Sequence, residues 1–194
     1  MNTTTDQYHI DQTLSGNTAA FGQLVERYQD YVFTIVVRMT RNKEEAQEIA
    51  QDTFVKAYQS LSSFRGESKF SSWLYTIAYR KTLDRIKQQK RTVGSEDIDQ
   101  CNEGDLGAVT NALDYLLLEE RKSVINKAIE SLAPDVAAII TYYYYEELSV
   151  KEIVDITGLG ADNIKVKLFR GRKKLFTLLK QSILPEIQNG YGTV

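Results

Sequence analysis

The chain has 194 residues, with 24 lysine and arginine residues against 26 aspartate and glutamate residues, one histidine, one cysteine and two prolines. A chain of this length forms one domain or two small ones and can bury a core, while a lone Cys101 excludes a disulfide framework and a zinc site built with the single histidine. No basic start leads into an apolar stretch and no apolar run spans a bilayer, so the sequence predicts a cytoplasmic protein with no membrane insertion and no cofactor.

The first half of the chain has the apolar spacing of helices. Apolar residues at three- and four-residue steps predict a long helix over 21–39, and His9 is expected in a mobile N-terminus before it. Asn42 and Glu45 form an N-x-x-E capping-box pattern, which predicts that a second helix begins there and runs to about Ser60.

A serine-rich loop at 62–69 precedes a third helix, which runs from about Phe70 to Arg91 because no proline or glycine interrupts it. No stretch of useful length alternates with a period of two, so strands are not expected. The third helix leaves one strip to solvent that suits a phosphate backbone, although an ordinary solvated face is the alternative. This strip consists of Thr76, Arg80, Asp84, Lys87 and Arg91.

Charge is distributed in blocks along the chain, although the net charge is only −2. Residues 80–91 carry six basic residues and one acid, and residues 163–180 carry seven basic residues and no acid. Between them, residues 92–120 carry eight acids and no lysine or arginine. Two basic modules joined by an acidic, weakly apolar spacer suggest anion binding at both ends, with solvated helix faces as the plain alternative.

Helical spacing resumes after the spacer and ends near Pro134, which suits the first turn of the next helix. That helix carries four consecutive tyrosines at 142–145, which cover every side of a helix, so at least one must face solvent. They are interpreted as a packed wall and not as a platform for stacking bases.

The C-terminal region has the pattern of a helix-turn-helix. Ser149 and Glu152 form an S-x-x-E capping box for a short helix, and the glycines at 158 and 160 permit a sharp turn before a basic helix. At 100° per residue, Val166 and Phe169 lie opposite the inner stripe, where they could contact thymine methyl groups in a major groove. A two-helix packing unit is the alternative. The inner stripe comprises Ile164, Leu168, Gly171, Leu175 and Leu178.

The sequence therefore predicts an all-α protein with two small helical domains joined by a flexible acidic linker, the C-terminal domain containing the helix-turn-helix. The predicted boundaries are 1–92 for the N-terminal domain, 93–118 for the linker, 119–182 for the C-terminal domain and 183–194 for a tail.

From about Asn17 to Leu179, the chain resembles the extracytoplasmic-function (ECF) class of bacterial RNA polymerase sigma factors. No single block is decisive, but three blocks in the expected order in a chain of this length are strongly specific. They are AF at 20–21 with EAQEIAQDTF at 45–54, FSSWLYTIA at 70–78 with DR at 84–85, and LS at 148–149 with EI at 152–153, IK at 164–165 and RGR at 170–172.

The resemblance implies a subunit that is not an enzyme and that gives core RNA polymerase its promoter specificity. It implies that Glu48, Gln51 and Asp52 dock the clamp coiled coil of the largest subunit. The flap of the second-largest subunit is a further implied contact. The linker would thread toward the RNA exit channel, and an anti-sigma factor would hold the protein inactive.

The resemblance also divides promoter recognition between two parts of the chain. The loop at 62–69 and the helix from Phe70 match the part that melts the upstream edge of the transcription bubble and captures a flipped base, which suits a concave loop. The helix-turn-helix matches the part that recognises the upstream element as duplex DNA. The implied downstream residues are Ser62, Ser63, Phe64, Arg65, Gly66, Lys69, Thr76, Arg80, Lys87 and Arg91, and the implied upstream residues are Asn163, Val166, Lys167, Phe169, Arg170, Lys173 and Lys174.

Six positions depart from the family pattern, so the resemblance carries over the recognition surface and not its target sequence. Arg80 stands where asparagine is usual, Thr76 and Ala137 where arginine is common, Val166 where serine is common, Lys167 where arginine is common and Phe169 where histidine is common.

Two other classes of function are the alternatives to a sigma factor. A helix-turn-helix regulator that is not a polymerase subunit would need a ligand-binding or dimerisation domain, for which little chain remains. A nucleic-acid hydrolase would need clustered carboxylates, whereas Glu44, Glu45, Glu48 and Asp52 are spread along a helix surface.

Overall fold

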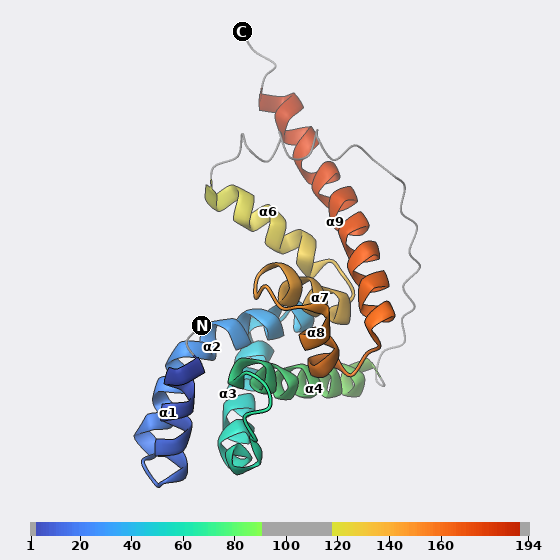
Figure 1. Ribbon diagram of the computed structural model, residues 1–194. Helices are drawn as coiled ribbons and strands as arrows, with labels where there is room; N and C mark the ends of the chain where they lie inside the picture. The colour runs from blue at the N-terminus through green and yellow to red at the C-terminus, as the bar shows by residue number, and fades with distance from the viewer. Residues whose placement is uncertain (1–2, 91–117, 191–194) are drawn as a thin grey trace.

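The computed structural model describes residues 3–90 and 118–190, and every regular element in these two ranges is helical, which confirms the all-α prediction (Figure 1). None of the described helices has the length and apolar character needed to cross a membrane. In chain order the elements are α1 (Thr3–Leu14), α2 (Thr18–Thr40), α3 (Lys43–Gln59), the short 3₁₀ helix η1 (Leu61–Ser63), α4 (Phe70–Lys90), α6 (Leu118–Glu130), α7 (Pro134–Tyr144), α8 (Val150–Thr157) and α9 (Ala161–Gly190).

Helices α2, α3 and α4 form the centre of the N-terminal half, and each packs against the other two. The apolar stripe predicted on α2 is its buried face, with Leu24, Val32 and Ile35 removed from solvent. Helix α2 ends at Thr40, and Arg41 follows with a left-handed backbone that turns the chain. The Asn42 side chain then caps α3 by accepting a hydrogen bond from the Glu45 N–H. These two signals place α3 where the sequence predicts it.

The N-terminal segment is helical, so the expectation of a mobile N-terminus around His9 is wrong. Helix α1 packs against α2 through buried Ile10. The buried Asp6 carboxylate pairs with Arg27 and accepts a hydrogen bond from the Tyr28 hydroxyl at 2.5 Å. Few apolar residues mark α1 in the sequence, and besides Ile10 it is held by charged and phenolic groups on another helix, which periodicity does not detect.

The C-terminal half contains the predicted helix-turn-helix in α8 and α9. Pro134 occupies the first turn of α7 as expected, and Gly158 takes the left-handed backbone (φ 72°) that ends α8. Helix α9 continues to Gly190, past the residue at which the tail was predicted to begin. The predicted linker at 93–118 lies outside the described residues except for Leu118, where α6 begins.

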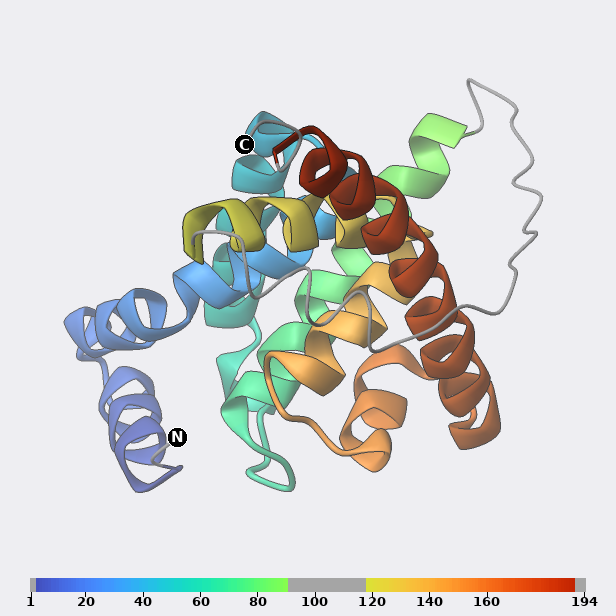
Figure 2. The same cartoon turned by 90° about the horizontal axis from the view of Figure 1, so that it is seen from above.

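The two halves of the chain pack together over one shared core. Helix α7 contacts α2, α8 contacts α4, and both also contact α9, so α7 and α8 lie between the N-terminal helices and α9 (Figures 1 and 2). Tyr142 of α7 is 0% exposed and stacks on Tyr75 of α4, with 5.8 Å between ring centroids. Of the four consecutive tyrosines, Tyr144 and Tyr145 reach solvent, which confirms that the run is a wall with an outer face.

Gly171 on α9 allows the close approach of α7. A Cβ atom at this position would lie 2.8 Å from Val136 Cγ1 and 3.2 Å from two side-chain carbons of Ile140. Gly171→Ala is therefore expected to lower the free energy of unfolding by about 1–3 kcal/mol, despite the better helix propensity of alanine. The matched control is Gly22→Ala within α2, where a Cβ meets nothing within 4 Å and stability should rise by about 0.5–1 kcal/mol. Urea denaturation of both variants measures these shifts, and shifts of the same sign would contradict the packing argument.

Candidate polymerase- and DNA-binding surfaces

The predicted polymerase-docking residues Glu48, Gln51 and Asp52 form an exposed strip on α3, here called the docking strip. The side chains of Glu48 and Asp52 are 68% and 63% exposed, so both carboxylates remain open to solvent. Gln51 also lines a mainly apolar groove of about 610 Å³ between α2 and α3. The docking strip thus combines two negative charges with a neighbouring apolar surface. The groove is lined by Val25, Gln29, Asp30, Phe33, Gln47, Ala50, Gln51, Phe54 and Val55.

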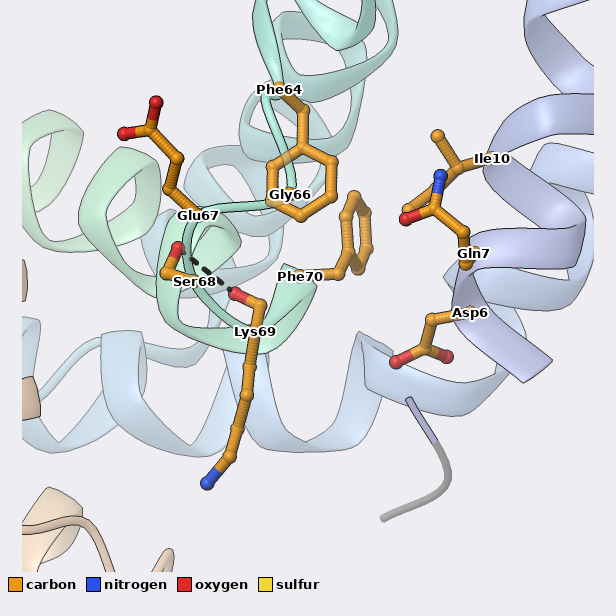
Figure 3. Close-up of a pocket in the computed structure, with 9 residues that line it drawn as sticks. All are labelled: Asp6, Gln7, Ile10, Phe64, Gly66, Glu67, Ser68, Lys69 and Phe70. Atoms are coloured by element: carbon orange, nitrogen blue, oxygen red, sulfur yellow. Dashed lines mark hydrogen bonds between the residues drawn. The ribbon is translucent and has the colours of Figure 1, made fainter. Parts of the chain in front are cut away.

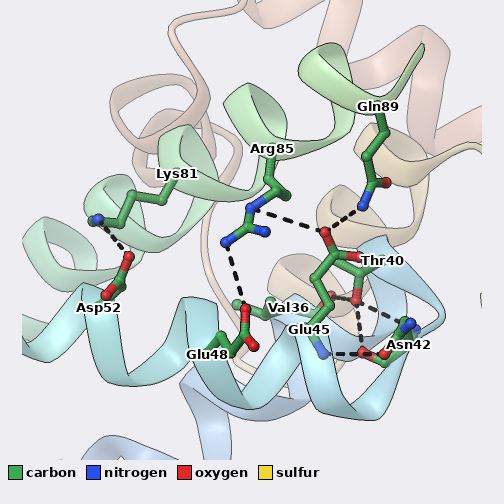
Figure 4. A network of polar contacts seen from close by, with 9 residues as sticks. All are labelled: Val36, Thr40, Asn42, Glu45, Glu48, Asp52, Lys81, Arg85 and Gln89. Atoms are coloured by element: carbon green, nitrogen blue, oxygen red, sulfur yellow. Dashed lines mark hydrogen bonds and ion pairs between the residues drawn. The ribbon is translucent and has the colours of Figure 1, made fainter. Parts of the chain in front are cut away.

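A ladder of polar contacts joins α3 to α4, and Figure 4 shows it from close by. Asp52 Oδ2 lies 3.3 Å from Lys81 Nζ, and Glu48 Oε2 lies 3.6 Å from Arg85 Nη2. Glu45 accepts a hydrogen bond from Gln89 Nε2 at 2.6 Å, so its carboxylate binds to α4. The docking strip is therefore held in place by basic residues of the helix that the resemblance assigns to promoter melting.

The capping box predicted at the start of α3 is only half formed. The Glu45 N–H donates to Asn42 Oδ1 at 3.0 Å, which is the first half of the box. The Glu45 carboxylate points away to Gln89 and Arg85, and the Asn42 N–H lies 3.5 Å from Thr40 Oγ1. The N-x-x-E pattern places the helix start correctly but does not give the partner of the glutamate.

The loop before α4 borders a pocket of about 300 Å³, shown in Figure 3. Phe64 is half-buried and meets Phe70 edge to face, with 5.7 Å between ring centroids. Gly66 has a left-handed backbone (φ 72°) that turns the loop around the pocket. On the opposite side, α1 contributes three residues to the wall, which sequence analysis did not predict. The pocket is lined by Asp6, Gln7, Ile10, Phe64, Gly66, Glu67, Ser68, Lys69 and Phe70.

The other described residues that were predicted for the downstream element lie on the loop and on α4, outside the pocket lining. Ser62, Ser63 and Arg65 are exposed on the loop. On α4, Arg80 and Lys87 are exposed, whereas Thr76 is half-buried and donates its hydroxyl to the Ser72 carbonyl at 2.9 Å. Arg91 lies outside the described residues.

The helix-turn-helix has the geometry that the sequence predicts. Ser149 and Glu152 form a complete capping box at the start of α8. On α9, Ile164 and Leu168 are buried, while Val166 and Phe169 are 45% and 60% exposed. Helical periodicity thus predicts correctly which of these α9 residues are buried and which are exposed.

The basic residues of α9 differ in their surroundings. Arg170, like the neighbouring Asn163, is exposed, whereas Lys173 and Lys174 are half-buried. Lys167 is also half-buried, and its Nζ lies 2.6 Å from Asp135 Oδ2 of α7. Lys167 therefore links α9 to α7 within the C-terminal half.

Polar contacts between the two halves, here called the seam, border the recognition surfaces. Lys69 Nζ of the downstream loop lies 2.9 Å from Glu152 Oε1 of the helix-turn-helix. The Tyr75 hydroxyl donates to Glu146 Oε2 at 2.8 Å, and burial raises the pKa of the Glu146 carboxyl above its usual value. Arg38 of α2 donates to Thr141 Oγ1 at 3.0 Å and to the Asn126 side chain at 2.9 Å. The loop and the helix-turn-helix are therefore directly connected in this structure.

The Lys69–Glu152 pair gives a titration test of the seam in solution. The hydrogen bond from Lys69, followed by those from Ser149, lowers the pKa of Glu152 to about 2. Because this pKa lies below the unfolded value, the pair stabilises the fold above about pH 4.5, and this stabilisation is lost as the pH falls toward 2. Lys69→Met is expected to raise the pKa of Glu152 while Ser149 keeps it below 4.5. An NMR titration of the Glu152 carboxyl carbon measures this, and an unchanged pKa would contradict a closed seam.

Some features of the site had a usable signal in the sequence and others did not. Lys81, Arg85 and Gln89 follow one another at four-residue steps, which places them on one face of a helix. The acidic residues of α3 also share one helix face, so the contacts between α3 and α4 had a detectable pattern. The contribution of α1 to the pocket had no such signal because α1 itself was not predicted.

Two family models match the chain, sigma-70 region 2 over residues 24–92 and sigma-70 region 4 over residues 122–175. The ECF RNA polymerase sigma-E factor of Salmonella typhimurium is 32% identical over 177 residues, which cover 88% of this chain and 92% of that relative. The RNA polymerase sigma-H factor of Pseudomonas aeruginosa is 28% identical over 176 residues, covering 88% of this chain and 91% of that relative.

The fold is also similar to that of a solved sigma factor. RpoE of Bartonella quintana, determined in complex with the anti-sigma factor NepR, matches with a TM-score of 0.64 at 21% identity, over 82% of this chain and 96% of that one. Sigma-70 regions 2 and 4 in one helical chain define a promoter-recognition subunit of bacterial RNA polymerase. The chain belongs to the ECF RNA polymerase sigma factors, which confirms the resemblance seen in the sequence.

Proposed function

We propose that this chain docks on the clamp coiled coil of the largest subunit of core RNA polymerase through the docking strip, with the flap of the second-largest subunit as a second contact. The observation that supports this most directly is the geometry of the docking strip on α3. Its two carboxylates are more than 60% exposed although both are positioned by α4. Acidic groups held in one geometry and bordered by an apolar groove suit a basic, partly apolar partner helix.

The proposal assigns promoter recognition to two surfaces. The loop at 62–69 and the outer strip of α4 capture and melt the downstream element, and α9 recognises the upstream element as duplex DNA. Exposed Val166 and Phe169 between the basic residues of α9 support major-groove contact, because a packing helix would bury them. The chain itself carries out no chemical step in this proposal and works in the cytoplasm with its polymerase.

The seam implies an order of events within the proposal. Lys69 is held by Glu152 in the free chain, so DNA phosphates or bases must displace that contact when the loop engages the promoter. The same rearrangement frees the helix-turn-helix to reach an upstream site. The proposal also includes an anti-sigma factor as a partner, since RpoE of Bartonella quintana was solved in complex with the anti-sigma factor NepR.

Run-off transcription with purified core RNA polymerase tests the proposal. Adding the full chain is expected to produce transcripts from defined start sites on genomic DNA fragments, and core polymerase alone is the control. A helix-turn-helix regulator that is not a polymerase subunit would bind DNA in the same assay without producing such transcripts, and that result would overturn the proposal.

Phe169→His tests the orientation of α9 on DNA. An exposed phenyl ring rewards thymine methyl groups, so the variant is expected to change which upstream sequences the holoenzyme selects without abolishing binding. Selection from a promoter library randomised at the upstream element measures this change. Leu175→Met on the inner side of α9 is the control and should leave the selected sequence unchanged. An unchanged selection for Phe169→His would show that this side chain does not face DNA.

A further inference from the structure

Residues of α1 form one wall of the pocket in Figure 3, and the promoter-recognition surfaces proposed above give these residues no role. Asp6, Gln7 and Ile10 face the loop across the pocket, with the aromatic rings of Phe64 and Phe70 alongside. A pocket of about 300 Å³ is at the lower end of the range for small-ligand sites. Its aromatic rings meet at 89°, so a planar group that enters the pocket finds both a ring face and a ring edge.

The charges around the pocket favour a base over a phosphate. Asp6 and Glu67 are acidic and Lys69 is the basic residue of the lining, so the lining carries no excess of positive charge to attract a phosphate. The neighbouring basic group, Lys69, is directed to Glu152. A flipped nucleotide would therefore place its uncharged base inside the pocket and keep its phosphates outside.

Gln7 supplies an acceptor that is oriented toward this space. Its Nε2 donates to Asp11 Oδ1 at 2.8 Å on the next turn of α1, which fixes the amide and directs Oε1 away from Asp11. Oε1 lies 4.0 Å from the position of a Cβ at Gly66, so it faces the loop across the pocket. By contrast, the Asp6 carboxylate is already bound by Arg27 and the Tyr28 hydroxyl. The α1 wall thus presents an amide oxygen toward the loop, whereas the Glu67 carboxylate points away from α1 (Figure 3).

We propose that Gln7 is a specificity-determining residue for the downstream element, whose Oε1 accepts a hydrogen bond from the exocyclic amino group of the flipped base. This proposal rests on the proposed role of the loop at 62–69 in base capture. Adenine, cytosine and guanine carry an exocyclic amino group, whereas thymine carries only a ring N–H and carbonyl oxygens. The thymine N–H lies between two carbonyl oxygens, which would approach the Gln7 oxygen and repel it, so the captured position selects against thymine.

The test uses the full chain in reconstituted holoenzyme with a promoter library randomised across the downstream element. Gln7→Met removes the acceptor and keeps the length of the side chain, so discrimination against thymine is expected to fall about fivefold at one position, the loss of a single hydrogen bond. Gln12→Met, the same change on α1 outside the pocket lining, is the matched control.

The outcomes separate this proposal from the one on which it rests. If replacing the loop at 62–69 changes the selected downstream sequence while Gln7→Met changes none of its positions, Gln7 does not contact the base and the inference is wrong. If neither replacement changes the downstream sequence, base capture by the loop fails as well. Thermal melting of each variant checks the fold, and a uniform loss of transcription without a change of base preference would also count against a specificity role.

Discussion

Replacing Asp52 by arginine is expected to lower the affinity of the chain for core RNA polymerase by about tenfold or more. Asp52 is 63% exposed in the middle of α3, so its carboxylate is available to a partner, and charge reversal at a contact replaces attraction by repulsion. The fold itself should change little. Among the described residues, the side-chain contact given up is an exposed ion pair with Lys81 at 3.3 Å, and such pairs contribute roughly 0–1 kcal/mol.

The ladder between α3 and α4 provides the control for this experiment. Lys81→Ala removes the same ion pair and leaves the Asp52 carboxylate in place. If the docking strip binds the polymerase, Lys81→Ala keeps its affinity while Asp52→Arg loses it, as measured by fluorescence anisotropy with labelled protein and core enzyme. Equal loss in both variants would instead mean that the ladder positions α4 and that Asp52 makes no contact of its own. Full affinity of Asp52→Arg would remove the docking assignment.

Features determined by neighbours in the sequence could be predicted from it. The start of α7 at Pro134, the capping box of Ser149 and the turn at Gly158 all depend on residues within one helical turn, and the structure confirms each of them. The exposed position of Phe169 was also predictable, because helical periodicity carries over from one turn to the next once the start of the helix is known.

Features that depend on contacts between distant segments were not predictable from this one sequence. Helix α1 is held by Asp6 against Arg27 and Tyr28, and no local pattern links these residues. The seam is a second case, since Lys69 meets Glu152 and Tyr75 meets Glu146 across more than 70 residues of chain. The loop and the exposed face of α9 were therefore predictable from the sequence, whereas the wall of the pocket and the contact between the two halves were not.

Tyr142 provides the sharpest test of the contact between the two halves, because its ring lies on α7 and packs against α4. It is fully buried on α7 and lies against Tyr75 and Tyr79 of α4, with ring centroids 5.8 and 6.5 Å away. Tyr142→Ala is expected to lower the free energy of unfolding by about 3–5 kcal/mol, as for other large buried aromatic residues. Tyr142→Phe should leave stability unchanged or raise it by about 1 kcal/mol, since the Tyr142 hydroxyl has no hydrogen-bond partner among the described residues.

Two further controls show which half responds. Tyr75→Phe removes the donor to the half-buried Glu146 carboxyl and should cost about 1–3 kcal/mol, the reverse of the effect at Tyr142. Trp73 is the single tryptophan and lies on α4, so its fluorescence follows unfolding of the N-terminal half. If the halves share one core, Tyr142→Ala in the C-terminal half lowers the urea midpoint of the Trp73 signal together with that of the far-ultraviolet circular dichroism. A Trp73 midpoint that stays at the wild-type value would show that the halves unfold separately and that the seam does not hold them together.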